Sequence, residues 1–139
     1  TPGIADPGSK LVNFLSMELP EAKIIPIPGP SALISALSAA GISANQFTFL
    51  GYPPQKKGRQ TFFKNLKNIE VRPIVLYESP HRLEKNFLGL MDNFGKDFNI
   101  MVFRELTKIH EEIFRGSLEK CQKHFIGEHK KGEFVLIIP

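Results

Sequence analysis

Three short polar clusters each follow directly on an apolar run that is typical of a buried strand. The clusters are Pro28–Ala32, Glu78–Arg82 and Arg104–Lys108. Between them they carry carboxylate, hydroxyl, imidazole, guanidinium and ammonium groups, which can bind a polar ligand and move protons. The carboxyl ends of parallel strands meet at one edge of a sheet, where open α/β sheets place their ligands. The pattern therefore predicts a ligand site at a sheet edge.

The first cluster belongs to the stretch Ile24–Gly41, which we interpret as a strand, a sharp turn and a helix. The apolar run that starts at Ile24 predicts a buried strand of a parallel sheet. Gly29 lies between two prolines that end the strand, and Ser31 is placed to cap the helix that follows. The alanines of this helix leave room for a ligand. An ordinary β–α corner with no ligand is the alternative, and the Pro-Gly-rich loop Thr1–Gly8 is open to the same two interpretations.

The elements that must position these clusters can be placed by periodicity and by turn residues. We expect helices at Gly8–Glu18, Gln60–Asn68, Pro80–Phe94 and Leu118–Phe125, and strands at Phe47–Leu50, Pro73–Tyr77, Asn99–Phe103 and Glu133–Ile138. His110–Arg115 alternates apolar and polar residues, as a half-buried antiparallel strand does. The fold class is therefore α/β with a mixed sheet. Residues 1–43 are interpreted as the end of a first domain, and residues 44–139 as a second one.

Composition narrows the classes of protein that are possible. The 18 basic and 14 acidic residues give a net charge of +4, which is compatible with a nucleic-acid partner. The single Cys121 excludes an internal disulfide framework and indicates a cytoplasmic setting. No signal peptide or membrane span is recognised, and no His/Cys cluster predicts a metal site. We expect His110, His124 and His129 to be surface or packing residues.

An ordered series of motifs covers essentially the whole chain. They are TPGIADPG, IPIPGPSALISALSAAG, GYPPQKKGR, YESPHRL, RELTKIHEE and KGEFVLI. Together they resemble the ribosomal RNA small subunit methyltransferase I family of the tetrapyrrole methylase superfamily. The resemblance implies S-adenosylmethionine-dependent 2′-O-methylation of a cytidine in 16S ribosomal RNA of the 30S particle. It also implies a homodimer of two-domain α/β chains, with no membrane and no metal. Because the match starts partway through the family's first domain, we expect the amino-terminal part to be missing.

The resemblance also implies a set of cofactor contacts. By position these are Thr1, Ile4, Ser31, Ala32, Glu78 and Leu106. Glu78 stands where porphyrin-type relatives have Met, and Leu106 stands where they often have Gly, so at these two places backbone contacts are expected. Because half of the cleft is missing, the chain alone is expected to bind S-adenosylmethionine weakly or not at all.

A 2′-hydroxyl is a poor nucleophile until its proton is removed, so the implied reaction needs a general base or strong orientation. The candidates in the clusters are Glu78, Glu105, His81 and Lys108. We predict that Glu78 or Glu105 is the catalytic base. The alternative is that these two carboxylates pair with Arg82 and Arg104 and brace the strand ends. Sulfonium chemistry requires no metal.

The basic loop Gly51–Gly58 predicts an RNA contact, because lysines lie there beside an aromatic residue. The predicted RNA-binding set is Lys56, Lys57, Arg59, His81 and Arg82. A merely solvated loop is the alternative. Two other functions remain open: a methylase of the same superfamily that acts on a tetrapyrrole or diphthamide precursor, and a truncated, non-catalytic module for RNA binding or dimerisation.

Overall fold

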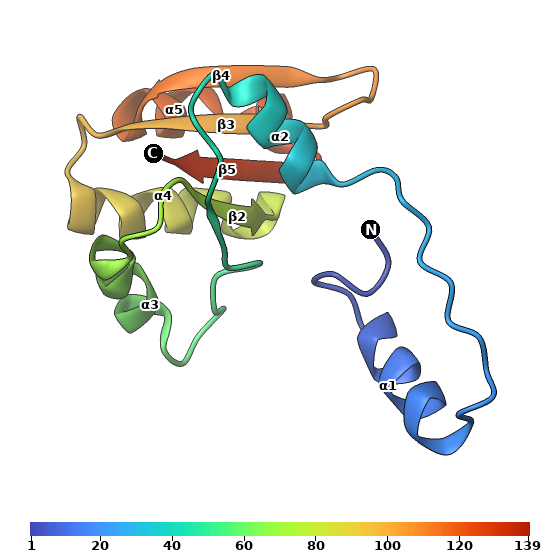
Figure 1. Ribbon diagram of the computed structural model, residues 1–139. Helices are drawn as coiled ribbons and strands as arrows, with labels where there is room; N and C mark the ends of the chain where they lie inside the picture. The colour runs from blue at the N-terminus through green and yellow to red at the C-terminus, as the bar shows by residue number, and fades with distance from the viewer. The chain divides into compact units, whose positions relative to one another are not determined.

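A computed structural model describes all 139 residues, and the chain forms two compact units, Thr1–Ala32 and Leu33–Pro139 (Figure 1). The elements in chain order are α1 (Gly8–Glu18), α2 (Ala32–Ala40), β1 (Thr48–Phe49), α3 (Arg59–Asn65), η1 (Leu66–Asn68), β2 (Ile74–Glu78), α4 (Pro80–Phe94), β3 (Asn99–Arg104), β4 (Glu112–Ser117), α5 (Leu118–His124), η2 (Gly127–Lys130) and β5 (Phe134–Ile138). None of these helices combines the length and the apolar character that crossing a membrane requires.

The second unit is built on a five-stranded mixed sheet with the strand order β1-β2-β5-β3-β4. β1 pairs with β2 in parallel, whereas β5 runs antiparallel to both of its neighbours, β2 and β3. β2 and β3 therefore point in the same direction although they do not touch. The predicted mixed α/β sheet and the antiparallel strand after residue 110 are confirmed.

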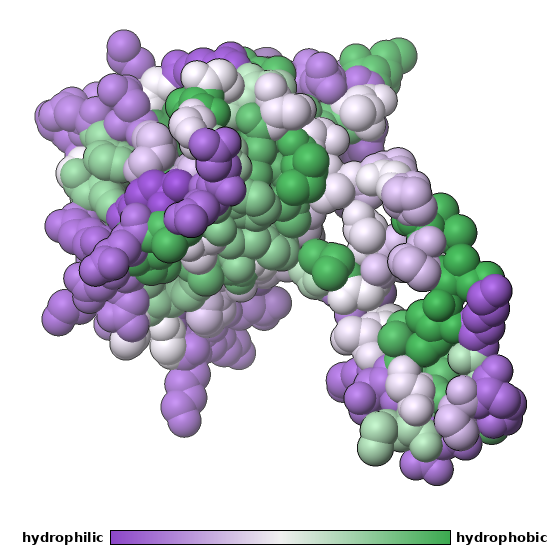
Figure 2. All heavy atoms as spheres, viewed as in Figure 1, coloured by the Kyte–Doolittle hydropathy of each residue, from purple (hydrophilic) through white to green (hydrophobic).

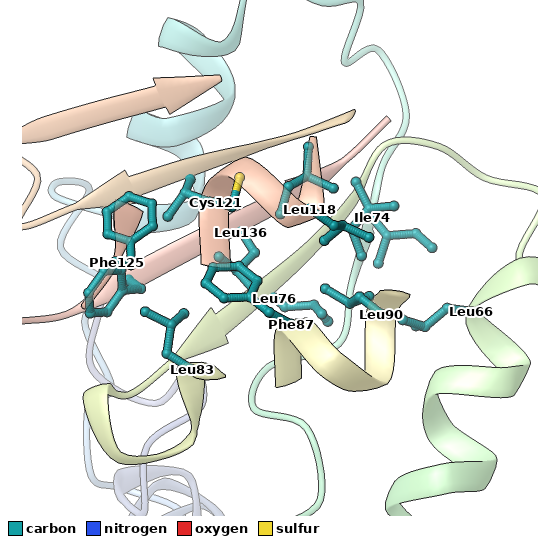
Figure 3. Packing of buried hydrophobic residues seen from close by; sticks show 14 of the residues in the cluster. Leu66, Ile74, Leu76, Leu83, Phe87, Leu90, Leu118, Cys121, Phe125 and Leu136 are labelled. Carbon is teal, nitrogen blue, oxygen red and sulfur yellow. The ribbon is translucent and has the colours of Figure 1, made fainter. Parts of the chain in front are cut away.

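Alternation along the strands gives the sheet two apolar faces. α3, α4 and α5 cover one face, and the larger part of the core lies there. In Figure 3, Leu83, Phe87 and Leu90 of α4 lie over Leu76 and Leu136 of the sheet. Each of these side chains is 1% exposed or less, and burying one is worth about 1.5–3 kcal/mol.

The helix α2 covers the opposite face of the same sheet. Its buried residues are Leu33, Ala36, Leu37 and Ala40, which pack with Val75 and Val135 among others. The predicted domain boundary after residue 43 stays a prediction. Within this chain the compact units divide before Leu33, because the apolar side of α2 is part of the core of the second unit.

The first unit contains α1 as predicted, but the predicted strand from Ile24 to Ile27 is wrong. These residues form no strand, and Ile27 is 81% exposed. A strand requires a partner for its backbone hydrogen bonds, and residues 1–32 contain no other strand. α1 has no buried residue either, and Figure 2 shows its apolar side chains on the outside of this unit.

Candidate functional site

Two of the three polar clusters lie at the same edge of the sheet. Glu78, at the end of β2, and Arg104, at the end of β3, both pair in register with Phe134, the first residue of β5. The two residues therefore lie two strand spacings apart, about 9–10 Å. The third cluster, Pro28–Ala32, falls in the first unit, outside the sheet.

Glu78 is the buried centre of the cluster Glu78–Arg82, which we call the β2 cluster, and its exposed fraction is 1%. The backbone N–H of Ser79 donates to Oε1 at 2.9 Å, and the Nδ2 of Asn86 donates to Oε2. Arg82 Nε lies 3.9 Å from Oε1. Burial raises the pKa of Glu78, and the bond from Ser79 and the charges of Arg82 and Arg59 oppose the rise. Both carboxylate oxygens are therefore occupied by donors from the chain.

Two arginines are tied to this carboxylate through neighbouring side chains. Arg59 Nε donates to Asn86 Oδ1 at 3.0 Å, and Arg82 Nε donates to Ser79 Oγ at 3.0 Å. Each guanidinium also lies over an aromatic ring, Arg59 over Phe63 and Arg82 over Tyr52. Ser79 occupies the N-cap position of α4, but its hydroxyl accepts from Arg82 and forms no cap bond. The arginines are held in fixed orientations.

These side chains line a pocket of about 150 Å³, which we name the basic pocket. Its lining residues are Pro54, Gln55, Lys56, Arg59, His81, Arg82, Lys85 and Asn86. Four of the five predicted RNA-binding residues meet there, whereas Lys57 is exposed on the loop beside it. Four lysines and arginines line the pocket and no carboxylate does, so it suits an anion such as a phosphate group.

Sequence reasoning missed two residues of the basic pocket, Lys85 and Asn86. Asn86 is 2% exposed, and it lies next to Phe87 on the inward side of an amphipathic helix. A polar residue at such a position must find a buried partner, and this was the signal available in the sequence.

The β3 cluster has a different geometry, because its loop is strained. Glu105 and Thr107 have φ values of 48° and 65°, in the left-handed region, with Leu106 between them. Glu105 Oε1 accepts bonds from Lys108 Nζ and from the backbone N–H of Glu133, both at 2.8 Å. The bond from Lys108 lowers the pKa of Glu105, and the Glu133 N–H adds to this.

The alternative in which both carboxylates pair with arginines of their own cluster describes only one of them. Glu78 lies beside Arg82, as that alternative requires. Glu105 instead pairs with Lys108, while Arg104 forms an ion pair with Glu112 at 3.4 Å. Glu105 has a left-handed backbone conformation, and its carboxylate accepts the backbone N–H of Glu133, the residue just before β5.

In the first unit, two of the segments assigned to the cofactor are joined directly. Thr1 Oγ1 donates to the carbonyl oxygen of Pro30 at 2.6 Å, so the first loop lies against the turn that precedes Ser31. Within the loop, Asp6 accepts the backbone N–H groups of Gly3 and Gly8, and these bonds lower the pKa of Asp6. Part of the loop's donor capacity is therefore used internally.

The profile of the Tetrapyrrole (Corrin/Porphyrin) Methylases matches residues 1–122. The chain belongs to the tetrapyrrole methylase family. Two solved structures have a similar fold. The methyltransferase CobJ gives a TM-score of 0.68 with 19% sequence identity, over 98% of this chain and 60% of that one. Uroporphyrin-III C-methyl transferase from Thermus thermophilus, complexed with S-adenyl homocysteine, gives a TM-score of 0.60 with 13% sequence identity, over 94% of this chain and 58% of that one.

Within the tetrapyrrole methylase family, the curated relatives confirm the resemblance read from the motifs. Two of them are named Ribosomal RNA small subunit methyltransferase I. The protein from Synechocystis sp. is 41% identical over 99% of this chain and 49% of its own length. The protein from Thermotoga maritima is 38% identical over 99% of this chain and 60% of its own length. The chain therefore spans about half to three fifths of the length of these relatives.

Proposed function

We propose that this chain is part of an S-adenosylmethionine-dependent methyltransferase that modifies the 2′-hydroxyl of a cytidine in 16S ribosomal RNA. The observation that carries the proposal is the identity of about 40%, over 99% of the chain, to relatives named for methylation of small-subunit ribosomal RNA. A homodimer in the cytoplasm, acting on the 30S particle, belongs to the same proposal.

The family implies S-adenosylmethionine, and residues of both units suit it. Within the first unit the bond between Thr1 and Pro30 brings the predicted contacts of the two segments together. In the second unit Leu106 lies between two left-handed residues, each of which costs about 1–3 kcal/mol. Such strain is concentrated at ligand sites, which supports a backbone contact at Leu106. When bound, the cofactor supplies a methyl group on a sulfonium.

The basic pocket supports an RNA substrate, because its cations converge on a space suited to a phosphate group. We assign Glu78 to this pocket as a positioning residue. Its oxygens accept the backbone N–H of Ser79 and the amide of Asn86. The Ser79 hydroxyl and the Asn86 carbonyl oxygen in turn accept from Arg82 and Arg59 and orient them. Neutralising Glu78 should therefore weaken RNA binding even though the carboxylate itself is buried.

Of the two predicted bases, Glu105 has the more accessible carboxylate, with a side chain that is 16% exposed against 0% for Glu78. The ammonium of Lys108 holds its pKa below the usual value, so Glu105 is ionised at neutral pH and able to accept a proton. The lowered pKa also makes it a weaker base. The catalytic role of Glu105 is tested with Glu105→Gln in the methylation assay.

Methyl transfer to 30S particles provides the main test. The chain is assayed alone and after extension at its amino end with the corresponding residues of the Synechocystis relative. We expect the extended protein to produce 2′-O-methylcytidine in 16S RNA, detected by nuclease digestion and mass spectrometry. We expect the chain alone to bind S-adenosylmethionine weakly or not at all in calorimetric titration.

The outcomes of this test separate the alternatives. Methylation of a base, or of a tetrapyrrole or a diphthamide precursor, would refute the proposed substrate. RNA binding by an extended protein that also binds the cofactor but transfers no methyl group would favour the non-catalytic module. If the chain alone and the extended protein bound S-adenosylmethionine with equal affinity, this would contradict the expectation that the amino-terminal extension is needed for cofactor binding.

The contribution of the basic pocket can be tested on two adjacent lysines. Lys56 lines the pocket and Lys57 does not. Lys56→Ala should lower the slope of log affinity against log salt by roughly 0.7 on single-stranded RNA or 0.9 on a duplex, as the loss of one phosphate contact does. Lys57→Ala is the matched control and should change the slope less. Equal slopes for the two variants would mean that the whole loop, rather than the pocket, contacts RNA.

A further inference from the structure

A second group of potential ligands lies in the same unit, outside the basic pocket. Glu112 of β4, His124 at the end of α5 and His129 of η2 place one ligand atom each within 4.8 Å of one another. His124 Nε2 contacts Glu112 Oε1, and His129 Nδ1 lies 3.2 Å from Glu112 Oε2. Ligand atoms around tetrahedral zinc are about 3.3 Å apart, so the pair of His129 and Glu112 already has that spacing, and the widest separation in the group exceeds it by at most about 1.5 Å.

The imidazole of His124 is held in place by aromatic neighbours. It stacks on Phe114 with 4.4 Å between ring centroids, and it meets the ring of Phe125 edge-on at 4.8 Å. The ring centroids of His124 and His129 are 4.9 Å apart. Because two of the three ligands come from a helix end and the 3₁₀ turn after it, the group joins that segment to the sheet.

Arg104 supplies an outer contact to the carboxylate. Its Nη1 donates to Glu112 Oε2 at 3.4 Å, while its Nε donates to the carbonyl oxygen of Lys131 at 2.6 Å. A carboxylate that ligates through one oxygen and accepts a hydrogen bond on the other is a usual arrangement around protein metals. Arg104 and His129 also line a neighbouring cavity of about 350 Å³.

We propose that Glu112, His124 and His129 form a zinc site, with water in the fourth position. Two imidazoles and one carboxylate suit Zn²⁺, and the oxygen-seeking ions Mg²⁺ and Ca²⁺ bind such a set poorly. The segment from His124 to His129 has the His-x₄-His spacing found in zinc proteins. The sequence reasoning overlooked this spacing when it assigned both histidines to surface or packing roles. The site does not depend on the proposed methyl transfer.

The groups close to the ion only partly balance its charge, because one carboxylate and two neutral imidazoles leave a bound Zn²⁺ with a net charge of +1. The carboxylate of Glu112 and two neutral imidazoles face the metal, and the guanidinium of Arg104 is the nearest cation. Its Nη2 donates to the backbone carbonyl of Glu128 at 3.3 Å, so part of its positive charge is met on the side away from Glu112.

Zinc binding is tested on the tag-free protein by calorimetric titration of Zn²⁺ and by elemental analysis after dialysis. We expect one zinc per chain and a rise of Tm when zinc is added. Glu112→Gln and His129→Gln should weaken binding by at least the 10–100-fold that loss of an outer contact costs. His129 is the more informative position, because its side chain is 55% exposed and its replacement leaves the core intact.

His110→Gln is the matched control, because His110 lines the neighbouring cavity but is not one of the three ligands. It should bind zinc as the unmodified chain does. The proposal fails if no stoichiometric zinc is retained, if His129→Gln binds zinc with unchanged affinity, or if His110→Gln loses it. Displacement of zinc by an equal concentration of Mg²⁺ would also refute it, because that would identify an oxygen site. Visible absorption of the Co²⁺-substituted protein, lost in His129→Gln, would support it.

Discussion

Replacing Glu78 by glutamine tests the buried network at its centre, because both neighbours of this carboxylate are donors. The Ser79 N–H and the Asn86 amide each require an acceptor. A glutamine offers one carbonyl oxygen and one NH₂ group, so one donor must face another donor. The variant therefore leaves a buried donor unsatisfied although its size is unchanged.

The magnitude follows from this geometry. A buried unsatisfied donor costs about 1–3 kcal/mol, and a hydrogen bond to a charged group contributes about 1.5–3 kcal/mol. The ion pair with Arg82 adds little, because that side chain is 25% exposed and the closest atoms are 3.9 Å apart. We expect the free energy of unfolding to fall by about 2–3 kcal/mol. At a melting entropy of about 2.1 cal/mol/K per residue, Tm falls by roughly 7–10 °C.

The pH dependence has a definite sign. Burial raises the pKa of Glu78, so the folded state holds this proton more tightly than the unfolded chain does. The contribution of Glu78 to stability is therefore greatest below the unfolded glutamate pKa, about 4.3, and it decreases as the pH rises through the folded pKa. Since the glutamine does not titrate, the difference in Tm between the two proteins should narrow as the pH rises.

Thermal melting and single-turnover methylation by the extended protein are measured on the same preparations. Glu84→Gln is the control, because Glu84 lies on the same helix with a side chain 62% exposed. It should stay within about 0.5 kcal/mol of the unmodified chain. An unchanged Tm for Glu78→Gln, together with a rate loss on the order of 10²–10⁴, would refute the positioning role and identify a general base.

Three further predictions concern other parts of the second unit. Gly89→Ala places a Cβ 2.7 Å from the ring of Phe63, so chemical denaturation should show a loss of about 1–3 kcal/mol, and an unchanged midpoint would mean that the ring moves aside freely. Burial raises the pKa of Cys121 to about 12, so a thiol reagent at pH 8 should label it only as fast as the protein unfolds, and rapid labelling would contradict this. The bond from Lys108 lowers the pKa of Glu105, so Glu105→Gln should cost under about 1 kcal/mol at pH 7. Acid titration should show this cost decreasing as the pH falls below the unfolded glutamate pKa of about 4.3 and through the lower folded pKa, and a cost that does not decrease would exclude the ion pair as its source.

Local patterns in the sequence were sufficient for the elements of the second unit. The apolar run of β5 and the alternation in β4 predicted a buried and a half-buried strand, and both are present. The stripe on α4 predicted its buried face. These signals are reliable because helix and strand periodicities depend on neighbours within a few residues. The ordered motifs were likewise sufficient to identify the family.

The outcome was different where a residue needed a distant partner. The run from Ile24 to Ile27 has the composition of a buried strand, but a strand forms only when another strand supplies hydrogen bonds, and the first unit has none. The same holds for ion pairs. Arg104 pairs with Glu112 rather than with the adjacent Glu105, because β4 returns alongside β3 and brings Glu112 opposite to it.

The two sites depended on tertiary structure in the same way. Residue types alone were enough to predict most of the basic residues of the basic pocket. The hydrogen bonds from Glu78 through Asn86 to Arg59, however, join β2, α4 and the start of α3. The three candidate zinc ligands are separated by 12 and 5 positions and meet only when η2 folds back on β4. The sequence alone gives the chemical type of each side chain. Which groups face one another was decided by strand order and register, because these bring together residues that no local pattern connects.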